Sequence, residues 1–190
     1  MLKNYYPYEH VKSVFDIDYK KLYALGFRGI IFDIDNTLVH HGDASTPEVD
    51  ALFKEIHKTG LKTLLLSNND TERIERFIKN IDTLYIPDAD KPSVDGYEKA
   101  IRMLGIEKRE AVFAGDQIFM DIYGANKCGM ANILVDFIKL PGETKIGKKR
   151  YIEKLILKIY KHTKYAHRLG NIKKCSNKHF NPLTPNHGGK

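Results

Sequence analysis

Short apolar runs alternate with amphipathic segments of helical period from about residue 20 to residue 140. The runs stay apolar at consecutive positions, as at 29–32, which is typical of a strand buried on both faces of a parallel sheet. The segments between them are long enough to be crossover helices. The alternation therefore predicts an α/β fold with a Rossmann-like, three-layer αβα arrangement around a parallel sheet.

The expected elements can be placed by their period and by their end signals. Helices are expected from Pro47 to a stop at Gly60, around 74–78, over 97–104, over 121–127 and, beyond the alternating region, over 148–169. The expected strands are 29–33, 62–66, 84–86, 111–114 and 132–135.

Polar residues follow these strands and form the candidate site. Asp33 ends the first strand, and Ser67 follows the second. Lys91 comes after the third strand, and Asp116 follows the fourth. The carboxyl ends of parallel strands meet at one edge of the sheet, where α/β folds bind ligands. We therefore expect these four side chains to share one crevice.

Asp33 and Asp35 have the spacing that sends two side chains to one side of an extended chain. Two carboxylates so close repel each other unless a cation lies between them, and Mg²⁺ takes carboxylate and phosphate oxygens together. Asp33 is then a candidate nucleophile and metal ligand, with Asp116 as a second metal ligand. Asp35 is a candidate acid and base for the leaving alkoxide and the attacking water. Taken singly, such residues also suit turns and helix caps.

Asp33-Ile34-Asp35-Asn36-Thr37-Leu38 resembles the first motif of the haloacid dehalogenase-like (HAD) superfamily, and the resemblance covers about residues 25–140. It implies that Asp33 is a nucleophile that forms an aspartyl-phosphate and binds Mg²⁺. It also implies that Asp35 is the acid and base, that its backbone carbonyl faces the metal, and that Thr37 positions it.

The later motifs of that family follow in the expected order. Ser67 matches the hydroxyl that holds the phosphoryl group, and Lys91 matches the cation that pairs with the phosphoryl oxygens and the nucleophile. Gly115-Asp116 with Asp121 matches the acidic loop that binds the metal. The resemblance thus implies Asp33, Asp35 and Asp116 as metal ligands, with Asp121 in support.

The segments 9–17, Ser67-Asn68-Asn69, Lys91-Pro92 and 115–117 look like the YqeG subfamily (HAD IIIA type), which is similar to phosphatidylglycerophosphate phosphatases of the mitochondrial type. Asn68 joins the site as a supporting residue by this resemblance. Superfamily members usually select small substrates with an inserted cap. Nine residues from Thr37 to the next helix, and twenty-four from Ser67 to Lys91, leave no room for one, so we expect a capless, open site.

Charge is divided unevenly along the chain of 190 residues. Residues 141–190 carry thirteen basic and two acidic residues, whereas 1–140 carry eighteen basic and twenty-two acidic residues. The basic part suggests an anionic partner, either membrane lipid or nucleic acid. Two other interpretations stay open, namely a solubilising tail and a helix that docks on its own domain. The division we expect is an N-terminal segment at 1–24, a phosphatase domain at 25–140, a basic amphipathic helix at 141–170 and a disordered tail at 171–190.

The cysteines, the length of the apolar stretches and the tyrosines near the start indicate where in the cell the protein works. Two cysteines, Cys128 and Cys175, suggest neither a disulfide framework nor a metal cluster, and the eight histidines are expected at the surface. We see no leader segment and no apolar stretch of the ~18–20 residues that span a bilayer. We expect a cytoplasmic protein, peripheral at the inner face of the membrane. Three tyrosines near the start would either anchor at the lipid interface or pack on the domain, namely Tyr5, Tyr6 and Tyr8.

Together these features predict Mg²⁺-dependent hydrolysis of a phosphomonoester on a phospholipid headgroup, with phosphatidylglycerophosphate as the favoured substrate. Two alternatives remain. One is a phosphatase for nucleic-acid ends or phosphoproteins, which the basic tail would also suit. The other is a phosphate-accepting switch without turnover, against which the retained Asp35 argues.

Overall fold

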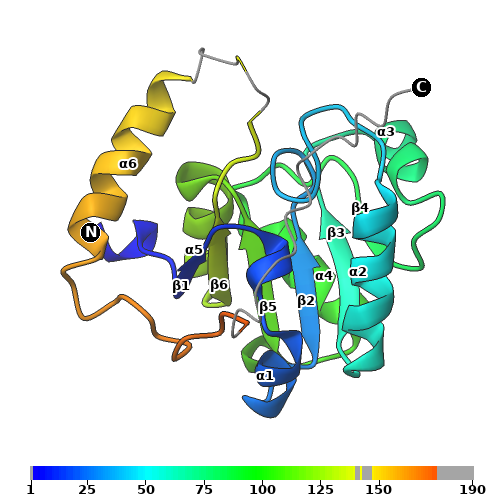
Figure 1. The fold of residues 1–190 in the computed structure, drawn as a ribbon, viewed down its shortest axis with the longest axis horizontal. Helices are drawn as coiled ribbons and strands as arrows, with labels where there is room; N and C mark the ends of the chain where they lie inside the picture. Colours follow the sequence, from blue (N-terminus) through cyan, green and yellow to red (C-terminus); the bar gives the residue numbers. More distant parts are fainter. Residues whose placement is uncertain (1, 140–141, 143–146, 175–190) are drawn as a thin grey trace, which may run out of the picture.

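A computed structural model describes residues 2–139, 142 and 147–174. The centre of the fold is one six-stranded sheet in which every paired strand is parallel (Figure 1). Its strand order is β1-β6-β5-β2-β3-β4. The strands are β1 (Glu9–Val11), β2 (Gly29–Phe32), β3 (Lys62–Leu66), β4 (Leu84–Ile86), β5 (Ala111–Gly115) and β6 (Ala131–Val135).

Helices cover both faces of this sheet, which confirms the predicted αβα layers. Apolar residues of α1, α2 and α3 pack on one face, and those of α4 and α5 pack on the other. The helices are α1 (Tyr19–Ala24), α2 (Pro47–Lys58), α3 (Thr71–Phe77), α4 (Val94–Leu104), α5 (Tyr123–Cys128) and α6 (Lys148–Tyr160). Short 3-10 turns lie at Leu2–Tyr5, Val14–Asp16 and Lys108–Glu110, and a π-helical turn lies at Ile118–Ile122.

The register of the sheet brings the expected site residues to one edge. Phe32, the last residue of β2, pairs with Leu65 of β3 on one side and with Ala114 of β5 on the other. The residues that come after these strands therefore leave the sheet at the same level. Because the three strands are parallel neighbours, Asp33, Ser67 and Asp116 all lie at the carboxyl edge.

The segments between the motifs leave no space for an inserted cap. The loop from Thr37 reaches α2 at Pro47, where Thr46 accepts a hydrogen bond from the Val49 amide at 3.3 Å, as a helix cap does. The chain between β3 and β4 holds α3 and connecting turns. All of these residues are described, and the capless architecture follows from them.

The predicted N-terminal segment, 1–24, is part of the same fold over its described residues, 2–24. β1 pairs with β6 at the edge of the sheet, and α1 packs in the main core. Tyr6 is buried, the Tyr5 ring stacks on Tyr123 at 4.8 Å, and Arg168 lies 3.4 Å from the centre of the Tyr8 ring. The three tyrosines therefore pack on the domain rather than anchoring it.

The C-terminal part differs from its prediction in two respects. α6 ends at Tyr160 rather than near residue 169, because the Thr163 hydroxyl bonds the Tyr160 carbonyl and accepts from the Tyr165 amide, which turns the chain. The tail predicted to be disordered from residue 171 is ordered at its start, since Ile172 is buried and Lys173 bridges to Ile17. Residues 175–190 of that prediction lie outside the described residues.

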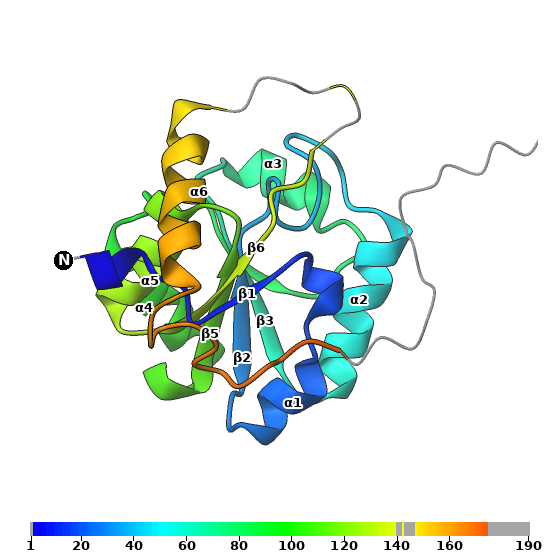
Figure 2. The same cartoon turned by 60° about the vertical axis from the view of Figure 1, so that its left-hand side comes forward.

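α6 stands beside the sheet rather than in either helical layer, as two views show (Figures 1 and 2). Its inner side packs with Tyr6, the π-helical turn and Leu134 in a small separate core. Among the described residues, no helix is long and apolar enough to cross a membrane.

Candidate active site

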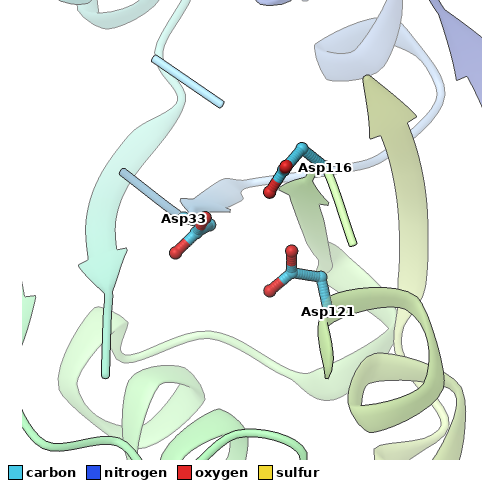
Figure 3. Close-up of side chains that lie close together, drawn as sticks. All are labelled: Asp33, Asp116 and Asp121. Atoms are coloured by element: carbon cyan, nitrogen blue, oxygen red, sulfur yellow. The ribbon is translucent and has the colours of Figure 1, made fainter. Parts of the chain in front are cut away.

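Three carboxylates converge at the carboxyl edge of the sheet. Asp33 follows β2, Asp116 follows β5, and Asp121 lies in the π-helical turn after β5. One oxygen from each lies within 4.8 Å of the others, and all three side chains are buried (Figure 3). The approach requires glycine at Gly115, because a Cβ there would lie 2.5 Å from the Asp121 carboxylate. The predicted acidic loop is thus brought together with the predicted nucleophile.

Two basic side chains enter this cluster. Lys91 Nζ lies 2.6 Å from Asp33 Oδ1 and 2.8 Å from Asp121 Oδ1. Arg150, which comes from α6, pairs with the Asp116 carboxylate and also donates to the Asp116 carbonyl at 2.7 Å. The charged groups in contact are four buried carboxylates, the buried Lys91 and the half-buried Arg150; the carboxylates are Asp33, Asp116, Asp121 and Glu153.

The excess of carboxylates over cations changes the pKa values of the acidic residues in the cluster. Burial, together with the negative charge of Asp121, raises the pKa of Asp33 to about 6 although Lys91 opposes the change. Burial and the charges of Asp121 and Asp33 likewise raise the pKa of Asp116, against the opposing effect of Arg150. A hard divalent cation has the charge and the oxygen preference that would offset this excess. The donor set therefore fits a hard divalent cation, the class to which Mg²⁺ belongs.

Asp35 lies outside the cluster and has its own partners. Its carboxylate accepts from Arg73 at 2.9 Å, from Asn69 at 2.8 Å and from the Gly42 amide at 3.1 Å, and His41 Nδ1 lies 3.2 Å away. Burial disfavours the ionised form, but these hydrogen bonds and the Arg73 charge outweigh it and lower the pKa of Asp35. Asp35 is therefore ionised at neutral pH in this state, and a role for its backbone carbonyl at the metal stays a prediction.

Thr37 is placed differently from its prediction. Asn36 adopts a left-handed conformation (φ 62°), which asparagine tolerates, and its amide bonds the Val39 carbonyl at 2.7 Å. This turn sends Thr37 back toward the cluster, where its hydroxyl lies 3.2 Å from Asp33 Oδ2 and 3.4 Å from Asp116 Oδ1. Thr37 thus contacts the two carboxylates rather than positioning Asp35.

Ser67 and Asn68 follow β3 and make different contacts. The Ser67 hydroxyl is buried and accepts from the amide and the side chain of Asn69 at 3.1 and 2.9 Å. Asn68 accepts from the Lys91 amide at 2.8 Å and donates to the Lys91 carbonyl at 3.3 Å. Asn68 therefore fixes the backbone that carries Lys91.

Four neighbours of the candidate site residues were not predicted from the sequence. Arg73 and Asn69 hold Asp35, while Arg150 and Glu153 reach the cluster from α6. One signal was available for Glu153, which is the only acidic residue within Lys148–Tyr160. An acid among the apolar and basic positions of a helix suggests a specific buried partner.

A cavity of about 330 Å³ lies beside Asp116, between α6 and the end of β6. Phe137 and Leu157 supply apolar parts of its wall, and Lys139 and Lys154 also line it. This size is within the range of small-molecule sites.

Known proteins resemble this chain in sequence and fold. A family model of haloacid dehalogenase-like hydrolases matches residues 41–129. Probable phosphatase YqeG of Bacillus subtilis (strain 168) is 36% identical over 137 residues, which cover 71% of this chain and 80% of that protein. The human phospholysine phosphohistidine inorganic pyrophosphate phosphatase is 40% identical over 45 residues, 24% of this chain and 17% of that protein.

Among solved structures, an uncharacterized protein from Listeria monocytogenes serotype 4b aligns with a TM-score of 0.50 and 18% identity, over 71% of this chain and 99% of that one. This likeness concerns the fold alone.

Proposed function

The chain belongs to the haloacid dehalogenase-like hydrolase family as a phosphatase related to YqeG, and from that premise we propose that it hydrolyses phosphomonoesters through an aspartyl-phosphate on Asp33 with Mg²⁺. The observation that carries the proposal is the buried contact of Asp33 with Lys91, 2.6 Å apart, inside the carboxylate cluster. A nucleophile held beside a cation in a buried site is suited to attack an anionic phosphoryl group.

Each residue has a defined task in this reaction. Asp33 attacks phosphorus, while Lys91 and the Ser67 hydroxyl hold the phosphoryl oxygens. Asp35 gives a proton to the leaving oxygen and later takes one from the water that cleaves the acyl-phosphate. Since Asp35 is ionised in the free state, the incoming phosphate dianion would have to raise its pKa before it acts as an acid.

Asp33 and Asp116 would hold Mg²⁺, with the Asp35 carbonyl as the third predicted contact and Asp121 next to them in support. When bound, Mg²⁺ would neutralise these carboxylates and the phosphoryl oxygens, which favours the ionised form of Asp33.

The proposed substrate is a phospholipid headgroup, with phosphatidylglycerophosphate as the candidate. The capless site supports a large or embedded substrate, and the cavity beside Asp116 offers further room. The outer face of α6, defined here as Tyr151, Ile152, Leu155 and Ile159, exposes between 46% and 60% of each side chain. Basic residues flank this face, among them Lys154 and Lys158.

An amphipathic helix with exposed apolar residues and flanking lysines suits the surface of an anionic bilayer, where each lysine contributes ~1 kcal/mol. Arg150 contacts Asp116 from the first turn of the same helix. A bilayer that receives α6 would therefore lie near the acidic cluster. The exposed apolar face favours lipid over a nucleic-acid end as substrate, since nucleic acid is bound mainly through charge and stacking.

The test is release of phosphate, with and without Mg²⁺, from phosphatidylglycerophosphate in vesicles, from an aryl phosphate and from a 5′-phosphorylated oligonucleotide. We expect the lipid to be the preferred substrate and Asp33→Asn to serve as the blank. Preference for the oligonucleotide would replace lipid by nucleic acid as the substrate class. No release in any arm would favour a phosphate-accepting switch.

A further inference from the structure

Arg150 and Glu153 join α6 to the acidic loop between β5 and α5. Arg150 uses both ends of its guanidinium, since Nη1 donates to the Asp116 carbonyl at 2.7 Å and Nη2 pairs with Asp116 Oδ2. The same Nη1 lies 3.0 Å from Glu153 Oε2. Arg150 is thus shared between the loop and its own helix.

Glu153 holds the next part of the loop. Its Oε1 accepts from the Ile118 amide at 2.8 Å and from the Phe119 amide at 3.4 Å. These amides begin the π-helical turn Ile118–Ile122, which carries Asp121. Glu153 is 6% exposed, so its charge is compensated by the protein rather than by water.

On the premise of the proposed function, we infer that Arg150 and Glu153 form a clamp that positions the two acidic residues of the loop for a divalent cation. Arg150 is a positioning residue for Asp116, and Glu153 is a positioning residue for the turn that carries Asp121. α6 then completes the active site in addition to presenting its outer face.

The direction of the Asp116 carboxylate supports a positioning role. Arg150 takes Oδ2, while Oδ1 lies at 3.4 Å from the Thr37 hydroxyl on the side of the cluster. A guanidinium that fixes one oxygen leaves the other oxygen oriented for a ligand, which is the usual function of groups behind metal ligands. Lysine would not replace Arg150, because an ammonium lacks the fork that contacts the carbonyl and the carboxylate together.

The clamp lies outside residues 41–129, which the family model matches. Arg150 and Glu153 are three positions apart on α6, so their side chains lie on the same side of the helix. The inner side of α6 continues with Ile156 and Tyr160, which are buried against the same turn and Tyr6. This packing holds the clamp in place relative to the loop.

The experiment measures Mg²⁺ affinity by calorimetry for the full chain and four variants, Arg150→Ala, Arg150→Lys, Glu153→Gln and Lys149→Ala. Lys149 is exposed one position before Arg150 and serves as the matched control. Removal of a group behind a metal ligand weakens metal affinity by about 10–100-fold, which we expect for Arg150→Ala. Arg150→Lys should recover little of the loss, Glu153→Gln should lose less than Arg150→Ala, and Lys149→Ala should match the unmodified chain.

Hydrogen exchange of the cation-free protein gives a second readout. Arg150→Ala and Glu153→Gln should speed exchange at 116–122 and leave β3 unchanged. If Arg150→Ala leaves too little folded protein, the charge-balanced pair Arg150→Met with Glu153→Gln is measured instead, with the same expected loss of affinity.

Three results would overturn the clamp. Unchanged Mg²⁺ affinity in Arg150→Ala and in the paired variant would reduce the contacts to packing. Higher affinity in Arg150→Ala would make Arg150 a competitor of the cation rather than a support. Unmodified protein that binds no divalent cation would remove the proposed metal itself, and only this third result bears on the proposed function.

Discussion

The carboxyl edge of the sheet and the outer face of α6 reverse the usual distribution of polar and apolar groups. At the sheet edge, Asp33, Asp116 and Asp121 are buried together. On α6, Leu155 is 59% exposed and Ile152 is 53% exposed. Buried charges and clustered exposed apolar groups are the departures that carry information about function. In the proposed function, the first region binds a cation and an anionic substrate, and the second contacts the apolar part of a bilayer.

The two departures differ in what they cost the folded chain. Buried carboxylates are destabilising unless cations and hydrogen bonds compensate them, so the sheet edge depends on Lys91 and Arg150. Exposed apolar side chains on one helix face have little effect on the stability of the folded chain, because they make few contacts within it. Substitutions at the edge should therefore change chemistry and stability, whereas those on the outer face of α6 should change attachment to a membrane alone.

The largest expected effect is at the nucleophile. Asp33→Asn should lower Mg²⁺-dependent phosphate release by roughly 10⁴-fold or more, because the amide cannot form the acyl-phosphate. Steady-state kinetics with an aryl phosphate measures it. Asp82→Asn removes an exposed carboxylate and should leave the rate unchanged. Equal rates in Asp33→Asn and the unmodified chain would remove the sheet edge as the reaction centre.

Asp35→Asn should have a smaller effect, of about 10²–10⁴-fold, because a proton donor and acceptor is lost while the nucleophile remains. Breakdown of the intermediate should slow, so acid-quenched protein should carry phosphate on the peptide that contains Asp33. Mass spectrometry of the digested protein detects this adduct. Its absence, together with a reduced rate, would assign Asp35 to binding rather than to proton transfer.

The pH dependence of the free energy of unfolding should distinguish the buried carboxylates of the sheet edge from exposed acidic residues. The pKa of Asp33 is raised to about 6, so the cation-free folded chain binds a proton that the unfolded chain releases near pH 4. Stability is then lost as pH rises from about 4 to about 6, and the loss is complete above that window.

In EDTA at pH 7.5, Asp33→Asn should therefore be more stable than the unmodified chain by on the order of 2 kcal/mol, and the difference should vanish near pH 4. Urea unfolding across this pH range measures it. Saturating Mg²⁺ should reduce the difference, since the cation stabilises the ionised carboxylates. A difference independent of pH would mean that burial of Asp33 does not destabilise its charge.

The smallest expected effect is on the outer face of α6. Leu155→Glu should weaken binding to anionic vesicles by about tenfold, because it replaces an inserted apolar group by a repelled charge. Its stability should stay within about 0.5 kcal/mol of the unmodified chain. Vesicle sedimentation measures binding, and Met103→Glu on α4, where the side chain is 40% exposed, is the matched control. Equal loss in both variants would point to net charge rather than to the α6 face.

The same contrast marks how far the sequence could predict the site. The positions of Asp33, Ser67, Lys91 and Asp116 could be predicted from the sequence, because each comes after an apolar strand and parallel strands end at one edge. Arg73 and Arg150 could not, since each is one of many basic residues on helices. Helical period by itself puts Ile152 and Ile156 on the same apolar side of α6, whereas in the structure only Ile156 is buried.

By itself the sequence determined the α/β class, the order of the strands along the chain and the identity of the motif residues, since these depend on local period and on the residue types at the end of each strand. Tertiary structure alone decided that β1 extends the sheet beside β6, that Thr37 contacts Asp33 and that α6 brings Arg150 to Asp116. These contacts join residues that are distant along the chain or that a turn brings together. Their energies come from burial and charge pairing, which no local pattern encodes.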